Sequence, residues 1–165
     1  MEPSASDPLT SAGPPTSWAN ARAQLAAADT YWLVTIGKDN IPHVVPVLAV
    51  WHDYALHFAA NNKSRKARNL ALNPRCTLST NAESLDMVVE GRAIRVVEAV
   101  KLRQVAHEYS AKYDWHVTVR DSAFHDTEGA PTAGPPPYDV YAVKPAIVYG
   151  FQTTASFNST RWRFD

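Results

Sequence analysis

The sequence predicts a mainly β fold of the α+β class, an antiparallel barrel that a helix caps. The chain contains about seven short runs that are rich in β-branched and aromatic residues, as strands are. Only two or three segments carry apolar residues at helical spacing. No segment repeats at the period of a solenoid or a propeller. Many short strands with few helices favour a barrel over a helical or an alternating α/β fold.

Length and composition point to one domain with no general attraction for polyanions. A chain of 165 residues is about one domain, and its 16 basic residues balance its 16 acidic ones. We therefore expect no nucleic-acid partner and no membrane partner. The single cysteine, Cys76, lies in an apolar run and is interpreted as a core residue. The sequence has no signal-like start and no apolar run that could span a bilayer, so we expect a cytoplasmic protein.

The first part of the chain predicts a flexible tail and then a helix. Residues 1–16 hold four prolines among small polar residues and have almost no apolar periodicity. We therefore expect a loose or draping tail over residues 1–16 and one folded domain over residues 17–165. The Ala-rich segment Trp18–Ala28 is predicted to be a short amphipathic helix.

Three strands are predicted next. Tyr31–Ile36 and Ile41–Trp51 are separated by turn residues and form a predicted hairpin, and Tyr54–Ala60 is the third strand. Pro42 and Pro46 lack the N–H that a sheet partner needs. Part of the second strand should therefore be an edge, a bulge or a place where a ligand meets the backbone.

The second half of the chain predicts four further strands and a long helix. Gly91 is expected to form a bulge. The segment Val117–Pro137 is too long for an ordinary connection and is interpreted as a lid or a disordered excursion. The other predicted elements are the strands Arg75–Thr80, Asp86–Val97, Tyr138–Val143 and Ala146–Phe151, the capping helix Glu98–Tyr113, a polar loop over Gln152–Thr160 and an aromatic and cationic ending over Arg161–Phe164.

The segment Asn61–Leu70 has the most distinctive chemistry. Ser64 is a good N-cap for a short helix, and four cations surround it: Lys63, Arg65, Lys66 and Arg68. Residues 61–81 include no acidic residue, and cations at a helix N-terminus oppose the helix dipole. Backbone N–H groups, a hydroxyl and cationic side chains together make a phosphate or carboxylate site. The alternative is a solvated basic face.

This segment resembles the pyridoxamine 5′-phosphate oxidase-like family of flavin-binding split β-barrels. The likeness rests on the run Ser64–Leu70, on Asn73-Pro74 just beyond it and on the hairpin before it, and it extends from about Tyr31 to Phe164. The resemblance implies an antiparallel split β-barrel with a short cofactor-site helix. It also implies that Ser64, Arg65 and Lys66 hold a cofactor phosphate and that the backbone of His43–Val47 runs along the isoalloxazine ring. Such proteins are homodimers with cofactors in two grooves between the subunits.

The sequence departs from the oxidases of this family in a way that resembles its F420-dependent branch. The oxidases carry an Arg and a Lys on the second strand, where this chain has Val45 and Val50. The Ala-rich entry helix and the Arg-Trp-Arg-Phe ending are also similar to the branch that uses the deazaflavin coenzyme F420. Lys63 and Arg68 suit its anionic tail. The residues expected to bind the cofactor are His43, Pro46, Val47, Asn61, Lys63, Ser64, Arg65, Lys66, Arg68, Asn69 and Trp162.

The resemblance implies an oxidoreductase that transfers a hydride between F420 and an unsaturated or quinone-like small molecule. The alternatives are an FMN-dependent oxidase or reductase and a non-catalytic protein that binds a flavin, F420 or a haem-related ligand. The sequence identifies no catalytic residue, and its six histidines show no metal-ligand spacing. His43 could be a proton donor, a ring contact or an exposed strand residue. Trp162 could stack in the groove or pack in the dimer.

Overall fold

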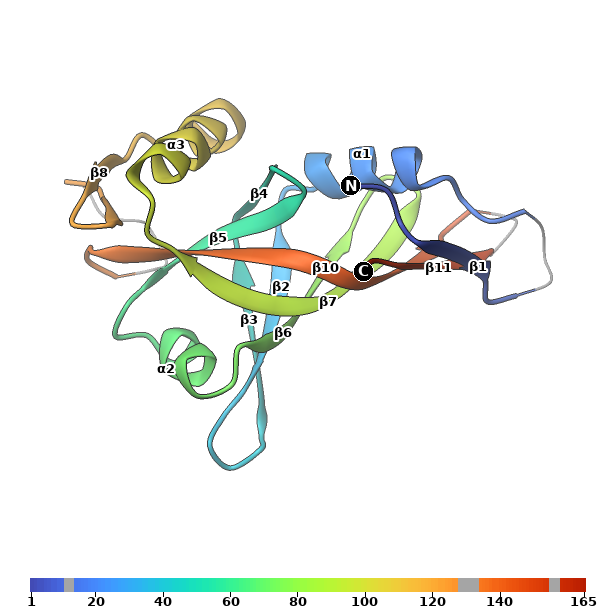
Figure 1. Cartoon of the computed structure of the whole chain (residues 1–165), viewed down its shortest axis with the longest axis horizontal. Helices are drawn as coiled ribbons and strands as arrows, with labels where there is room; N and C mark the ends of the chain where they lie inside the picture. The colour runs from blue at the N-terminus through green and yellow to red at the C-terminus, as the bar shows by residue number, and fades with distance from the viewer. Residues whose placement is uncertain (11–13, 128–133, 155–157) are drawn as a thin grey trace.

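The computed structural model describes residues 1–10, 14–127, 134–154 and 158–165, and Figure 1 shows the chain. Within these residues the helices are α1 (Trp18–Ala27), α2 (Arg65–Leu72) and α3 (Ala99–Tyr113). The strands are β1 (Ala5–Pro8), β2 (Tyr31–Ile36), β3 (Pro42–Val47), β4 (Ala49–His52), β5 (Ala55–Asn61), β6 (Arg75–Asn81), β7 (Leu85–Val96), β8 (Thr118–Arg120), β9 (Ala123–His125), β10 (Tyr138–Gln152) and β11 (Ser159–Arg163).

The strands form one antiparallel sheet that branches at β10. The main path runs β1-β11-β10-β7-β6-β2-β3, while β5 pairs with the first half of β10 and with β4. In Figure 1 the long strands β7 and β10 cross the molecule, with α1 and α3 above them and α2 below. The predicted fold class, a mainly β antiparallel split barrel with a short helix and a capping helix, is confirmed.

Two apolar cores lie within this fold. The first is inside the barrel, where α1 and the inward residues of β2, β5, β6, β7 and β10 meet around Leu33, Phe58 and Leu78. The second lies under α3, whose Leu102, Val105 and Tyr109 cover Val50 and Val140. The helices therefore take different roles, since α3 closes a core of its own and α2 closes the lower end of the barrel.

The first residues do not form the predicted loose tail. Ala5–Pro8 is strand β1, which pairs with β11 along the opposite edge of the sheet from β3. Asp7 accepts hydrogen bonds from both Arg161 and Arg163, and these bonds hold the pKa of Asp7 below its usual range. The proline-rich composition hid this strand, because its partner lies more than 150 positions away in the chain. The predicted polar loop Gln152–Thr160 ends earlier than expected, because β11 begins at Ser159.

Two strand predictions need correction. The predicted strand Ile41–Trp51 is broken at Leu48, where the chain leaves the partner β2 and begins a new pairing with β5. The predicted break at Lys144-Pro145 is absent, since β10 is continuous. The irregularity there is an extra residue, Ala146, on β10 opposite Gly91, and not a bulge of β7 itself. Gly91 is required because a Cβ atom would lie 2.5 Å from the carbonyl oxygen of Lys144.

The predicted lid is partly a small hairpin. Strands β8 and β9 pair with each other, and Phe124 of β9 pairs with Tyr138 of β10. Asp121 and Ser122 form the turn with positive φ angles of 51° and 54°. Trp115 and Phe124 pack on Tyr109 of α3, so the segment up to residue 127 is part of the second core. Residues 128–133 of the predicted lid lie outside the described residues.

Candidate functional site

The N-terminus of α2 is built as an anion-binding end. Ser64 has extended backbone angles, and its Oγ accepts a hydrogen bond of 3.3 Å from the N–H of Ala67. Helix geometry leaves the N–H groups of Arg65 and Lys66 without an acceptor inside the helix. The first turn carries no acidic residue. These donors therefore remain available to an external acceptor.

The loop before the helix is held by its own side chains. Asn61 Oδ1 accepts from the N–H of Lys63 at 2.8 Å, and Asn61 Nδ2 donates to the carbonyl of Pro135 at 2.5 Å. Arg68 reaches back from the helix and donates from Nη1 to the carbonyl of Lys63 at 2.6 Å. Asn61 and Arg68 thus shape the loop, and Lys63 projects from it as an exposed side chain.

Asn69, predicted to contact a cofactor, faces the sheet instead. Its Nδ2 donates to the hydroxyl of Thr35 on β2 at 3.0 Å, and both side chains are buried. The helix buries the face formed by Ala67, Asn69 and Leu70, so the amide has no path to a ligand at the N-terminus. Asn69 therefore positions α2 on the sheet. The helical spacing that places Asn69 near Leu70 was the signal for this orientation.

His43 is the one residue of the predicted ring-facing strand that joins the cations. It lies on β3 directly opposite Thr35, the residue that binds Asn69. Partial burial, and then the charges of Arg65 and Lys66, lower the pKa of His43, so its imidazole is neutral at pH 7. Burial also lowers the pKa of the half-buried Lys66. His43, Arg65 and Lys66 therefore share one positive field.

The other two residues of β3 that were predicted to bind the cofactor, Pro46 and Val47, do not join His43 beside the cations of α2. Side chains alternate along a strand, so Pro46 lies on the outer face, while Val47 is buried in the first core. The strand forms an edge of the sheet, which is one of the three alternatives that its prolines predicted. Of the two positions where the oxidases have cations, Val45 is on the same face as His43. Val50 is buried under α3 and does not face the cationic loop.

Trp162 does not reach a surface. Its side chain is 0% exposed and packs on Trp18, with ring centroids 5.7 Å apart. Gly150 makes room for it, because a Cβ atom there would lie 2.8 Å from the indole ring. The prediction that Trp162 binds a cofactor is therefore wrong for this chain, and neither stacking in a groove nor packing in a dimer describes it. The alternation Arg-Trp-Arg-Phe places Trp162 inward and its arginines toward β1.

A hollow of about 350 Å³ lies beside the cationic loop, between α2 and the strands β7 and β10. Asn62 and Arg68 line its helix side, and Arg95, Asp139 and Tyr141 line its sheet side. Arg95 Nη2 and Asp139 Oδ1 form an ion pair at 2.8 Å. Sequence analysis missed Arg95 and Asp139, because only the pairing of β7 with β10 brings them to α2.

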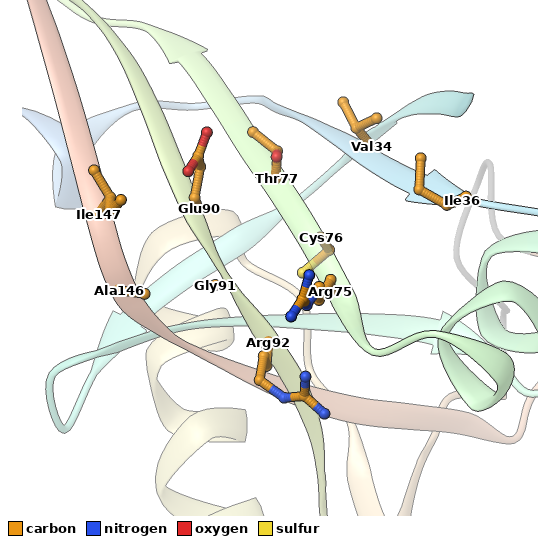
Figure 2. A pocket seen from close by; sticks show the side chains of 10 residues that line it. All are labelled: Val34, Ile36, Arg75, Cys76, Thr77, Glu90, Gly91, Arg92, Ala146 and Ile147. Carbon is orange, nitrogen blue, oxygen red and sulfur yellow. The ribbon is translucent and has the colours of Figure 1, made fainter. Parts of the chain in front are cut away.

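A second hollow, of about 440 Å³, lies on the outer face of the sheet (Figure 2). Val34, Ile36 and Ile147 give it apolar walls. Arg75 of β6 and Arg92 of β7 pair directly across the sheet at one end of it. Trp32 and Val44 continue this face and are 50% and 51% exposed. The alternation of residues along each strand can be read from the sequence. Which strands lie side by side, and therefore this shared surface, depends on the strand order of the sheet.

None of the helices within the described residues combines the length and the apolar character that crossing a bilayer requires. Within the same residues, no group of three or more histidine, cysteine, aspartate and glutamate side chains is arranged to hold a metal ion.

Solved structures with the same fold come from several bacteria. A conserved hypothetical protein from Mycobacterium tuberculosis has a TM-score of 0.66 and 20% identity, with 83% of this chain and 85% of that chain covered. A FAD-binding protein from Mesorhizobium loti has a TM-score of 0.60 and 16% identity, with 98% of each chain covered. A haem-binding protein from Mycobacterium smegmatis has a TM-score of 0.61 and 16% identity, with 79% of this chain covered. This chain spans about half of that haem-binding chain, 51%.

A search of curated protein sequences finds no match. The model of the pyridoxamine 5′-phosphate oxidase family matches residues 17–152, from the cap of α1 to the end of β10. This match includes the cationic loop, α2 and the strand that carries His43. Since it spans most of the sequence, the chain belongs to the pyridoxamine 5′-phosphate oxidase family.

Proposed function

We propose that this protein is an oxidoreductase that binds the deazaflavin coenzyme F420 and transfers a hydride between it and an unsaturated or quinone-like small molecule. The proposal rests on one observation above all. Ser64, Arg65 and Lys66 present a hydroxyl, free helix N–H groups and two cations in a segment with no acidic residue. That donor set fits a phosphate, and F420, FMN and FAD all carry one.

Two features support F420 over FMN. Val45, at one of the positions where the oxidases have cations, adds no charge to the His43 face. Lys63 and Arg68 extend the positive field beyond Ser64, and Arg68 also lines the hollow that holds the Arg95–Asp139 ion pair. A phosphate with an acidic tail would use this additional charge, whereas the single phosphate of FMN would leave part of it without a partner.

In this proposal the chain binds and orients, and the bound deazaflavin supplies the hydride chemistry. Arg65, Lys66 and the first helical N–H groups hold the phosphate. Asn69 and Thr35 fix the tilt of α2, and therefore the direction of those donors. The neutral imidazole of His43 can donate one hydrogen bond and accept another at the ring-facing strand. The apolar side chain of Val45 excludes water from the same face.

The test is a pair of titrations of the purified protein, one with F420 and one with FMN, each followed by fluorescence. The protein should bind F420 more tightly, and reduced F420 should be oxidised when a quinone is added in the presence of the protein. An FMN affinity about tenfold or more above that for F420, or about 1.4 kcal/mol, would overturn the F420 assignment.

The alternative function is a ligand-binding protein without turnover. Solved relatives include a FAD-binding protein and a haem-binding protein, so this fold accommodates more than one ligand class. Oxidation of the reduced cofactor by an acceptor distinguishes the two functions. Tight binding of F420 without oxidation of its reduced form by any quinone or unsaturated acceptor would favour the binding protein.

We also propose that the protein is a homodimer, as the family resemblance implies. The exposed Trp32 and Val44, with the apolar hollow beside Arg75 and Arg92, give the outer face of the sheet the character of an interface core with a charged rim. Sedimentation at micromolar concentration should give twice the chain mass. Trp32→Glu should shift the equilibrium toward monomer, whereas a wild-type protein that sediments as a monomer would contradict the proposal.

A further inference from the structure

His57 is a buried histidine at the place where α3 docks on the sheet. It lies in the middle of β5, between Val50 of β4 and Ala142 of β10, and its side chain is 0% exposed. Neither Nδ1 nor Nε2 has a hydrogen-bond partner within the described residues. Its backbone carbonyl, in contrast, accepts a hydrogen bond of 3.2 Å from the hydroxyl of Tyr109 on α3. The ring is thus enclosed where α3 docks on the sheet.

The charged groups around His57 come from three elements. On β4, the ring of His52 stands edge-on to that of His57, with centroids 6.0 Å apart. In the turn after β4, Asp53 Oδ2 pairs with Nζ of Lys101 from α3 at 2.9 Å. Glu108 of α3 contacts Nδ1 of His52 at 3.3 Å. From β10 the neighbour across the ladder is the apolar Ala142, and Lys144 further along acts on Asp53.

This arrangement opposes a proton on His57. An imidazolium would be a cation in an apolar core that no carboxylate contacts within the described residues, and the charges of Lys101 and His52 would repel it. Burial, followed by these two neighbours, lowers the pKa of His57 to about 4, although the backbone of Ala55 and then Asp53 act in the opposite direction. The closed structure therefore favours the neutral ring.

We propose that His57 is an acid-sensitive latch, whose protonation releases α3 from the hairpin of β4 and β5. The surrounding contacts make release a local event. Lys101–Asp53 and Glu108–His52 bridge α3 to that hairpin at the surface, and Leu102, Val105 and Tyr109 bury the apolar face beside His57. A charged ring would favour the state in which water reaches it, and that state requires α3 to move away.

Release would also reach the cationic loop. The residues after α3 return to the sheet, where β9 pairs with the start of β10. Just before β10, the carbonyl of Pro135 accepts the hydrogen bond from Asn61 in the loop. Loosening of α3 would weaken the packing of β8 and β9 and the support of this contact. The proposal does not depend on which cofactor the loop binds.

The direction with pH follows from the proton balance. A histidine in the open or unfolded chain takes up its proton near pH 6.5, whereas His57 in the closed structure does so only near pH 4. Between these values the open state binds up to one more proton, so the opening constant rises by at most about tenfold for each unit of pH decrease. The stabilisation from the neutral ring is fully present above about pH 6.5 and is lost as the pH falls toward about 4.

The test compares the wild-type protein with His57→Leu, which keeps an apolar side chain and removes the titrating group. Native-state hydrogen exchange, corrected for intrinsic rates, is measured for the amides of α3 and α1 at pH 6.5 and pH 4.5. The wild-type opening constant of α3 should rise about 40-fold more than that of His57→Leu over this range, as the two pKa values require. His107→Leu is the matched control, because His107 is an exposed histidine of α3, and it should behave like the wild type.

Equal pH dependence of α3 opening in the wild type and His57→Leu would overturn the proposal, and so would equal acceleration of α1 and α3 in the wild type. If His57→Leu does not fold, an NMR titration of the wild-type protein can still test the proposal. In protein labelled at its histidine rings, the NMR signal of His57 should stay at its neutral position from pH 7 to pH 5. A signal that titrates near pH 6.5 would show that the closed structure accepts the proton, and the latch would be disproved.

Discussion

The helices α2 and α3 both cover the sheet, but their charged side chains differ in position and in partners. On α3 several charged residues have partners: Lys101 binds Asp53, and Lys112 donates to the carbonyls of Ala26 and Ala49 near the helix C-terminus. On α2 the cations gather at the N-terminus, against the helix dipole, and the first turn has no acidic residue.

The lengths of the helices show the same contrast. α3 has 15 residues and buries Leu102, Val105 and Tyr109 in a core of its own. α2 has 8 residues, and a helix this short is stable only through its contacts with the rest of the protein. Paired charge on a long helix serves stability. Unpaired charge on a short helix that the sheet holds in place indicates a ligand, and each prediction below tests that distinction.

The largest effect should come from the core of α3. Leu102→Ala should lower the free energy of unfolding by about 2–5 kcal/mol, because it leaves a cavity under a fully buried side chain. Affinity for the cofactor, measured on the folded fraction, should not change. Leu72→Ala at the exposed end of α2 is the matched control, and its stability should stay within about 0.5 kcal/mol of the wild type. Equal losses from both variants would remove the contrast between the helices.

Lys66→Ala should lower cofactor affinity without lowering stability, the opposite of Leu102→Ala. Its affinity for F420 should fall by about 1.5–3 kcal/mol, the usual contribution of a hydrogen bond to a charged group. The cofactor-free protein should melt at the same or a higher temperature, because a half-buried cation near the positive end of the helix dipole has been removed. Lys101→Ala on α3 is the control, with unchanged affinity and a stability loss below about 1 kcal/mol. Unchanged affinity with reduced stability in Lys66→Ala would mean that Lys66 is structural.

Thr35→Val tests a buried polar contact that joins α2 to the sheet. The nearly isosteric change removes the acceptor of Asn69 and should lower the free energy of unfolding by about 1 kcal/mol. The affinity for F420 should fall slightly as well, because the helix donors lose their fixed direction. Thr77→Val, on the outer face of β6, should change neither quantity measurably. If Thr35→Val alters stability alone, the hydrogen bond does not orient the site.

The smallest effect should appear in the salt dependence. If Lys63 and Arg68 bind an anionic tail, affinity for F420 should fall with salt more steeply than affinity for a tail-free deazaflavin, since the Debye length decreases from about 10 Å at 0.1 M to about 3 Å at 1 M. The double variant Lys63→Met, Arg68→Met should bring the two salt curves close to parallel. The pair Arg22→Met, Arg103→Met removes the same charge elsewhere and should leave them different. Parallel curves in the wild type would exclude these side chains from tail binding.

Local patterns predicted the elements that their own residues specify. The spacing of Leu102, Val105 and Tyr109 located α3 almost to the residue, and Ser64 located the start of α2. The prolines of β3 indicated an edge strand. Strand β1 and the hairpin of β8 and β9 were missed, because few of their residues are apolar and their stability comes from partners far along the chain.

For the candidate site, the sequence by itself determined the donor set: a Ser N-cap and four cations over residues 63–68, with no acidic residue from 61 to 81. Only the tertiary structure decided which residues share that place. Strand pairing brings His43 to Arg65 and Lys66 and brings Arg95 to the adjoining hollow, while it buries Trp162 and turns Asn69 to Thr35. The physical reason is that charge and capping are properties of a local segment. Which face of a residue meets solvent, a ligand or the core depends on register, and register is set by contacts across the whole sheet.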